Sequence, residues 1–99
     1  MPQECKDKER ETQRAGDSYY NAITTWLTDR KRSDEQRQRA FSFARIYHRS
    51  LYLFRACLER LRHRPAARRK LDHAVELQQL LEKDMQVLAP STASAGDES

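Results

Sequence analysis

The residues best suited to chemistry in this sequence are arginines, which recur from Arg37 to Arg64. Glu59 is the single acidic residue in that range. The guanidinium group offers a planar fork of hydrogen-bond donors that matches the oxygens of a phosphate. A helix surface built only for solubility usually mixes both signs, because i,i+4 ion pairs stabilise it. The one-signed run therefore favours an anionic partner, with a solvated helix face as the ordinary alternative.

The positive charge is confined to the middle of the chain. The formal charge is −1 over residues 1–30, +10 over residues 31–70 and −5 over residues 71–99, although the net charge of the 99 residues is only +4. Such local concentration indicates a polyanionic partner more strongly than the net charge does.

Motifs that support catalysis or cofactor binding do not occur in the sequence. It has no glycine-rich phosphate loop, no paired cysteines at metal-ligand spacing, no H-E-x-x-H and no nucleophile elbow. His48, His63 and His73 are scattered at spacings of 15 and 10 residues, which does not favour a metal site. We therefore expect no catalytic residues, no cofactor, no metal and no small-molecule substrate.

An all-α fold is expected to carry these arginines. The chain allows one small domain, and its two glycines and three prolines are too few for the turns of a sheet. Apolar spacing predicts a short first helix over residues 17–30, begun by Asp17 or Ser18. The charged residues before it extend this helix or fray.

Two longer helices have clearer boundaries. The S-x-x-Q form of a capping box begins at Ser33, so a second helix is expected from there to about His63. Pro65 ends that helix and opens a third, from about Ala66 to Leu88. The resulting organisation is a charged N-terminal extension over residues 1–16, a helical domain over residues 17–89 and a disordered tail over residues 90–99.

The second helix also carries an apolar row with the 3,4 spacing of a heptad. The predicted first helix is too short to cover this row, so the third helix or a second copy must cover the rest. We expect an antiparallel four-helix homodimer in which two second helices pair around Ser50 and Leu51. Phe41 and Tyr52, on the basic face, are expected to be half-covered by the third helix. The row is Ala40, Phe43, Tyr47, Ser50, Phe54, Cys57 and Leu61, widened by Ala44, Ile46, Leu51 and Leu58.

The two cysteines, Cys5 and Cys57, are too few for a disulfide framework and are expected to be incidental. No apolar run approaches the roughly 20 residues of a membrane span, and the first residues contain no apolar signal-peptide core. We therefore expect a soluble, cytoplasmic protein.

Three short stretches resemble a known family. AITTWL at residues 22–27, RAF at 39–41 and RPAARRKL at 64–71 are similar to the small double-stranded-RNA-binding suppressors of RNA silencing of nodaviruses. The resemblance implies an all-helical homodimeric viral protein in the host cytoplasm. It would lie along an RNA duplex without regard to sequence and shield it from the host's silencing nuclease.

The resemblance and the charge pattern select the same RNA-binding arginines. The main phosphate and ribose contacts are expected from Arg45, Arg49, Arg60 and Arg64, with Arg37, Arg55, Arg68 and Arg69 at the ends and flanks.

Two functions from different classes follow from these patterns. The first is sequence-independent binding of double-stranded RNA by a homodimer. The alternative is a helical adaptor whose apolar row packs on another protein while its basic face stays solvated. The RNA-binding hypothesis needs the arginines exposed on one face. The adaptor hypothesis needs Phe43, Tyr47 and Phe54 exposed in the monomer.

Overall fold

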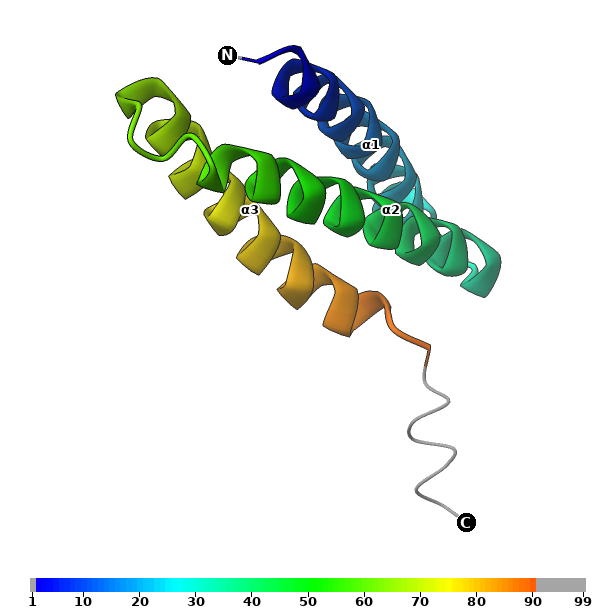
Figure 1. Ribbon diagram of the computed structural model, residues 1–99. Helices are drawn as coiled ribbons and strands as arrows, with labels where there is room; N and C mark the ends of the chain where they lie inside the picture. The colour runs from blue at the N-terminus through cyan, green and yellow to red at the C-terminus, as the bar shows by residue number, and fades with distance from the viewer. Residues whose placement is uncertain (1, 91–99) are drawn as a thin grey trace.

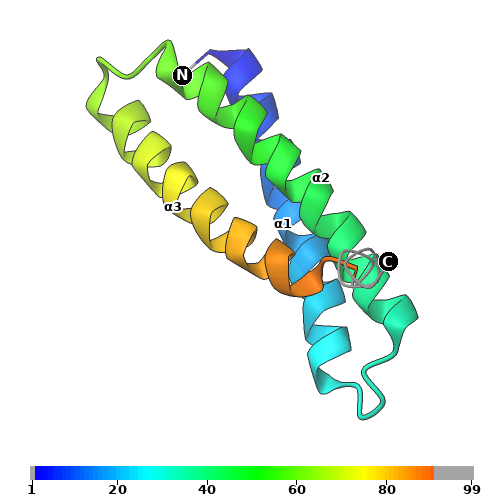
Figure 2. The ribbon, with the colours of Figure 1, turned by 90° about the horizontal axis from the view of Figure 1, so that it is seen from below.

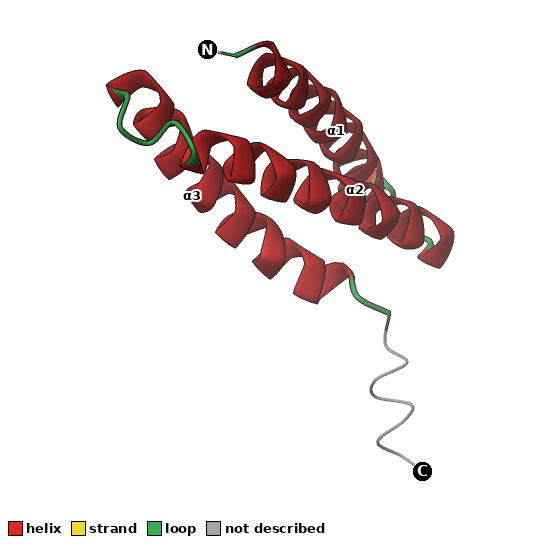
Figure 3. Cartoon of the chain, viewed as in Figure 1, coloured by secondary structure: helices red, strands yellow, loops and turns green. Residues whose placement is uncertain are grey.

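A computed structural model describes residues 2–90 of the chain. That part folds into three helices, α1 (Gln3–Thr28), α2 (Asp34–Glu59) and α3 (Pro65–Leu88), and contains no strand. The predicted all-α class is therefore confirmed. Figure 1 shows α2 between the other two helices, Figure 2 shows the same helices from below, and Figure 3 shows the short connections that join them. Each helix runs antiparallel to the next, so α1 and α3 are parallel to one another.

The start of α2 and the start of α3 lie close to where the sequence predicts them. The Ser33 hydroxyl accepts a hydrogen bond from the backbone nitrogen of Gln36 at 3.2 Å, which caps α2. The reciprocal half of the capping box is absent, because the backbone nitrogen of Ser33 donates to Asp29 Oδ2 instead. Pro65 is the first residue of α3, where its missing N–H costs nothing.

The C-terminal end of α2 differs from the prediction. The regular helix ends at Glu59 rather than near His63. The chain tightens there into a turn, in which the backbone nitrogen of Leu61 donates to the carbonyl of Leu58 at 2.8 Å. A second bond of the same i→i+3 type joins Arg64 to Leu61 at 2.8 Å, and this geometry reverses the chain before Pro65.

The prediction that the first helix begins at Asp17 or Ser18 is wrong, and the alternative that the charged residues before it extend the helix is confirmed. α1 starts at Gln3, and Gly16 lies in its middle. The glycine is needed for packing rather than as a break, since a Cβ atom there would lie 3.1 Å from Cζ of Tyr47. Residues 3–16 thus form the first half of α1, and residues 91–99 of the predicted tail lie outside the described residues.

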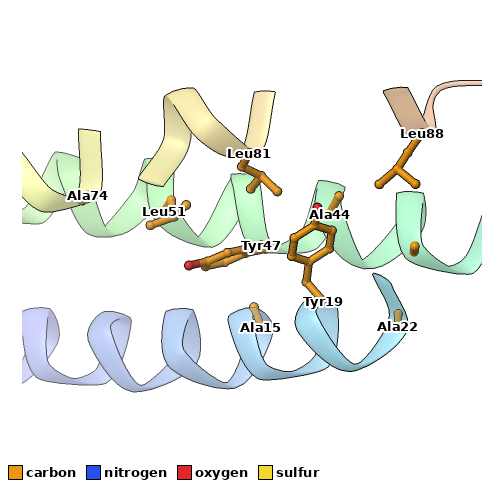
Figure 4. Packing of buried hydrophobic residues seen from close by; sticks show 10 residues of the cluster. Ala15, Tyr19, Ala22, Ala44, Tyr47, Leu51, Ala74, Leu81 and Leu88 are labelled. Carbon is orange, nitrogen blue, oxygen red and sulfur yellow. The ribbon is translucent and has the colours of Figure 1, made fainter. Parts of the chain in front are cut away.

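The longer α1 and the third helix, α3, together cover most of the apolar row of α2 within one chain. Tyr47 and Phe54 are each 6% exposed and Leu51 is 1% exposed. Figure 4 shows Tyr19 of α1 and Tyr47 of α2 filling the space between these helices, with Leu81 and Leu88 reaching down from α3. Alanines at the helix contacts let the backbones approach closely. These alanines are Ala15, Ala22, Ala40, Ala44 and Ala74.

A disulfide joins α1 to α2. Cys5 and Cys57 are bonded, with 5.7 Å between their Cα atoms, and both side chains are buried. The expectation that these cysteines are incidental is wrong, because the extra turns of α1 carry Cys5 alongside the last turns of α2. Disulfides persist mainly in oxidising compartments, so this bond argues against the expected cytoplasmic location.

In the described residues, α1 and α3 meet through side chains rather than through close backbone packing. The Tyr19 hydroxyl donates to Asp84 Oδ2 at 2.8 Å. Burial, and then this hydrogen bond, raise the pKa of Tyr19 well above its ordinary value. Burial likewise raises the pKa of Tyr47. Both rings are therefore neutral parts of the core at neutral pH.

Candidate nucleic-acid interface

The side of α2 that faces away from its neighbours is exposed along the whole helix. We call this surface the outer stripe. Its members recur every three or four residues, so they lie on one face. Every one of them is exposed in the chain. The outer stripe consists of Gln38, Ser42, Arg45, Arg49, Tyr52, Ala56 and Arg60.

Arg45 and Arg49 are the central cations of the outer stripe. Within residues 2–90, neither of them forms an ion pair with a carboxylate. Arg60 lies 3.4 Å from Glu4, but both side chains are about two-thirds exposed, at 66% and 64%. An exposed pair of this kind contributes at most about 1 kcal/mol. All three guanidinium groups can therefore meet an external anion at little cost.

Arg37 and Arg55 have structural contacts instead. Arg37 lies 2.6 Å from Asp34, and it also donates to the carbonyl oxygen of Leu88 at the end of α3. Arg55 donates to the side-chain oxygen of Gln78, which is buried in the contact between α2 and α3. Both arginines are half-buried, so the structure does not bring them onto the outer stripe.

The arginines around the start of α3 extend the exposed basic surface. Arg64, Arg68 and Arg69 are all exposed. A hollow of about 540 Å³ lies beside Arg68, between the end of α2 and the start of α3. Glu59 belongs to this hollow and lies 4.0 Å from Arg62, so the lone acid of the basic segment has a basic neighbour. The hollow is lined by Glu59, Arg62, His63, Arg68, Leu71 and Asp72.

The two aromatic residues of the basic face behave differently. Phe41 is half-buried and packs against the core. The prediction that Tyr52 is half-covered by the third helix is wrong, because Tyr52 is 61% exposed on the outer stripe. His48 turns toward α3, where its Nε2 atom lies 2.8 Å from Glu82 Oε2. The outer stripe thus presents one aromatic ring among its arginines.

The residues predicted for the dimer contact lie in the core of the single chain. Tyr47, Leu51, Phe54 and Cys57 are buried, and the other members of the predicted contact are half-buried. Pairing of α2 with its copy remains a prediction. The half-buried members are Phe43, Ser50 and Leu61. The prediction that Ile46 widens the core face is wrong, because its side chain is 54% exposed.

Two basic residues that the sequence reasoning missed lie at the start of α1. Lys6 and Arg10 line a hollow together with Arg64 and Lys70 of the second half of the chain. Their i,i+4 spacing places them on one face of a helix, and that spacing was the available signal. The spacing alone is weak evidence, because it is meaningful only if α1 extends back to Gln3.

Comparison with known proteins identified no relative, since no family model, curated protein or solved structure matches the chain. None of the helices in residues 2–90 has a stretch long and apolar enough to span a membrane. The same residues contain no group of three or more histidine, cysteine or acidic side chains that could hold a metal ion.

Proposed function

We propose that the chain binds double-stranded RNA without regard to sequence, through the outer stripe of α2 and the adjoining arginines of α3. The observation that carries the proposal is the exposed, same-face placement of Arg45, Arg49 and Arg60. Fifteen residues separate the first from the last of them, which corresponds to about 22 Å along a helix. A row of that length meets several phosphates of one duplex.

Duplex RNA suits this surface better than base-specific recognition does. The deep groove of an RNA duplex excludes side chains, whereas phosphates and 2′-hydroxyls are accessible across the shallow groove. The outer stripe offers cations on a straight helix and no loop that enters a groove. Tyr52 lies between the arginines and can pack against a ribose or a terminal base. The contacts would be independent of sequence.

The burial of Tyr47 and Phe54 weighs against the adaptor alternative. An adaptor of the expected kind needs Phe43, Tyr47 and Phe54 exposed in the monomer, but Tyr47 and Phe54 are each only 6% exposed and Phe43 is half-buried. Homodimer formation, by pairing of α2 with its copy, stays part of the proposal. The resemblance to nodavirus proteins extends the proposal to suppression of RNA silencing, in which the bound chain shields duplex RNA from cleavage.

The test is salt-dependent binding to RNA and DNA duplexes of one length, measured by fluorescence anisotropy. We expect RNA affinity to fall steeply between 50 and 200 mM salt. The combined variant Arg45→Gln with Arg49→Gln removes two phosphate contacts, so it should reduce the slope of log affinity against log salt by about 1.8. These two arginines are the best choice because their side chains have no intramolecular ion pair in residues 2–90.

A matched control removes the same charge elsewhere. Arg14→Gln with Lys83→Gln changes two exposed cations, on α1 and on α3, that lie off the outer stripe. We expect this control to keep most of the affinity and the salt slope. Absence of RNA binding at 50 mM salt, or equal losses in the two double variants, would contradict the proposal. Light scattering of the free protein tests the homodimer separately.

A further inference from the structure

A second basic site lies away from the outer stripe, between the start of α1 and the start of α3. A hollow of about 420 Å³ opens there, within the range of sizes that small-molecule sites occupy. Four of its nine lining residues are cations, and Glu9 is its only acid. The cations are Lys6, Arg10, Arg64 and Lys70.

The charges in this hollow are not balanced within the described chain. Glu9 is engaged by Lys70, whose Nζ lies 2.9 Å from Glu9 Oε2. Lys6, Arg10 and Arg64 form no ion pair in residues 2–90. Three cations therefore surround one space without a counter-charge. Their mutual repulsion is relieved most by a ligand with two or three negative charges, which a phosphate or diphosphate group carries.

The backbone at the start of α3 adds to the same field. Ala66 and Ala67, in the first turn of the helix, belong to the wall of the hollow. No side chain caps this helix, and its first turn contains no acidic residue. The first turn of a helix carries partial positive charge on its free N–H groups. The preference of the four side chains for an anion is thus reinforced.

An adjoining hollow supplies room for an apolar body. It has a volume of about 280 Å³ and shares Glu9, Gln13 and Lys70 with the first, so the two spaces are neighbours. Aromatic and aliphatic side chains form much of its floor, and Asp17 and His73 also line it. A ring joined to a phosphate group would fit the pair, with the phosphate among the cations. The floor includes Tyr20, Tyr47, Leu51, Phe54 and Leu77.

The disulfide holds the cationic wall in place. Cys5 directly precedes Lys6, and its bond to Cys57 fixes the first turns of α1 against the end of α2. Leu61, which follows that end of α2, also lines the first hollow. The cations of α1 are consequently positioned by a covalent link rather than by a fraying helix end.

We infer that these two hollows form a binding site for a terminal phosphate carried on a ring-containing organic group. The same chemistry occurs in free nucleotides and at the 5′-phosphorylated end of a nucleic acid. This inference does not rest on the proposed function. The first hollow shares Arg64 with the proposed RNA-binding surface, and the outer stripe contributes no residue to either hollow.

The test uses isothermal titration of the full chain with ADP, adenosine and inorganic pyrophosphate. We expect ADP to bind, adenosine to bind at least about tenfold more weakly, and pyrophosphate to compete with ADP. Arg10→Gln with Arg64→Gln should weaken ADP binding by about tenfold or more, since each replacement removes a charge-assisted contact. Both side chains are exposed, so circular dichroism should show unchanged helicity.

Two further arms complete the design. Arg45→Gln with Arg49→Gln removes the same charge from the outer stripe and should leave ADP binding unchanged. RNA duplexes with a 5′-phosphate and with a 5′-hydroxyl, each competing against ADP, identify the source of the phosphate. Stronger competition by the phosphorylated duplex indicates an RNA end, and equal competition indicates a free nucleotide. ADP binding that is absent, or that responds only to the outer-stripe variant, would overturn the inference.

Discussion

Reduction of the bond between Cys5 and Cys57 should weaken the fold more than any other mild treatment. The two cysteines are 52 residues apart in sequence. Closing a loop of that size in the unfolded chain is worth about 4 kcal/mol on a chain-entropy estimate. A small domain has a total stability of only about 5–15 kcal/mol. The reduced chain should therefore keep its helices with only a small free energy of unfolding, or its α1 should unfold at the N-terminal end.

Urea unfolding followed by circular dichroism at 222 nm measures this effect. With a urea slope of about 1–3 kcal/mol per molar, the midpoint should fall by more than about 1 M when reductant is added. The variant Cys5→Ser with Cys57→Ser is the control, since its midpoint should be low and insensitive to reductant. Equal midpoints for the wild-type chain with and without reductant would refute the reasoning. So would two free thiols in the denatured, unreduced protein.

Three smaller predictions concern contacts within and between the helices. Tyr19→Phe should lower the free energy of unfolding by about 1 kcal/mol, since it removes the hydrogen bond to Asp84, and urea titration measures the loss. Because folding raises the pKa of Tyr19, its contribution is complete below the ordinary tyrosine pKa of about 10 and is lost as the pH rises above it. Wild-type stability should thus fall more steeply than that of Tyr19→Phe between pH 9 and pH 11. Ser33→Ala should cost about 0.5–2 kcal/mol through loss of the α2 cap, and the same urea assay would detect no change if the cap contributed nothing. Gly16→Leu should destabilise by about 1–3 kcal/mol because the larger side chain displaces Tyr47, and a rise in melting temperature would contradict this.

The features of the fold that depend only on residues close together in the sequence were predictable. Ser33 and Pro65 mark helix starts because a hydroxyl cap and a missing N–H act within one turn. The start of α1 was not predictable from the sequence. Gly16 suggests a helix break unless Tyr47, 31 residues later, is known to pack against it. The disulfide depends on the same misplaced start, since Cys5 meets α2 only if α1 extends back to it.

The candidate site shows a similar division. Arg45, Arg49 and Arg60 are separated by 4 and 11 residues, and both intervals return to the same face of a helix, so their shared exposed face followed from sequence. Arg37 and Arg55 look equivalent in sequence. Their partners, however, are the carbonyl of Leu88 and the side chain of Gln78, which only the packing of α3 supplies.

The disulfide also sets how the chain is connected when the backbone is cut. Together with the short connection after Thr28, it closes residues 5–57 into a covalent ring that contains most of α1 and α2. A single protease cut inside this ring leaves both fragments attached to each other. A cut in the turn at residues 60–64 instead releases α3, which is held to the ring by non-covalent contacts alone. The chain is thus a cyclic helical hairpin with one detachable helix, and non-reducing electrophoresis of nicked protein would distinguish the two kinds of cut.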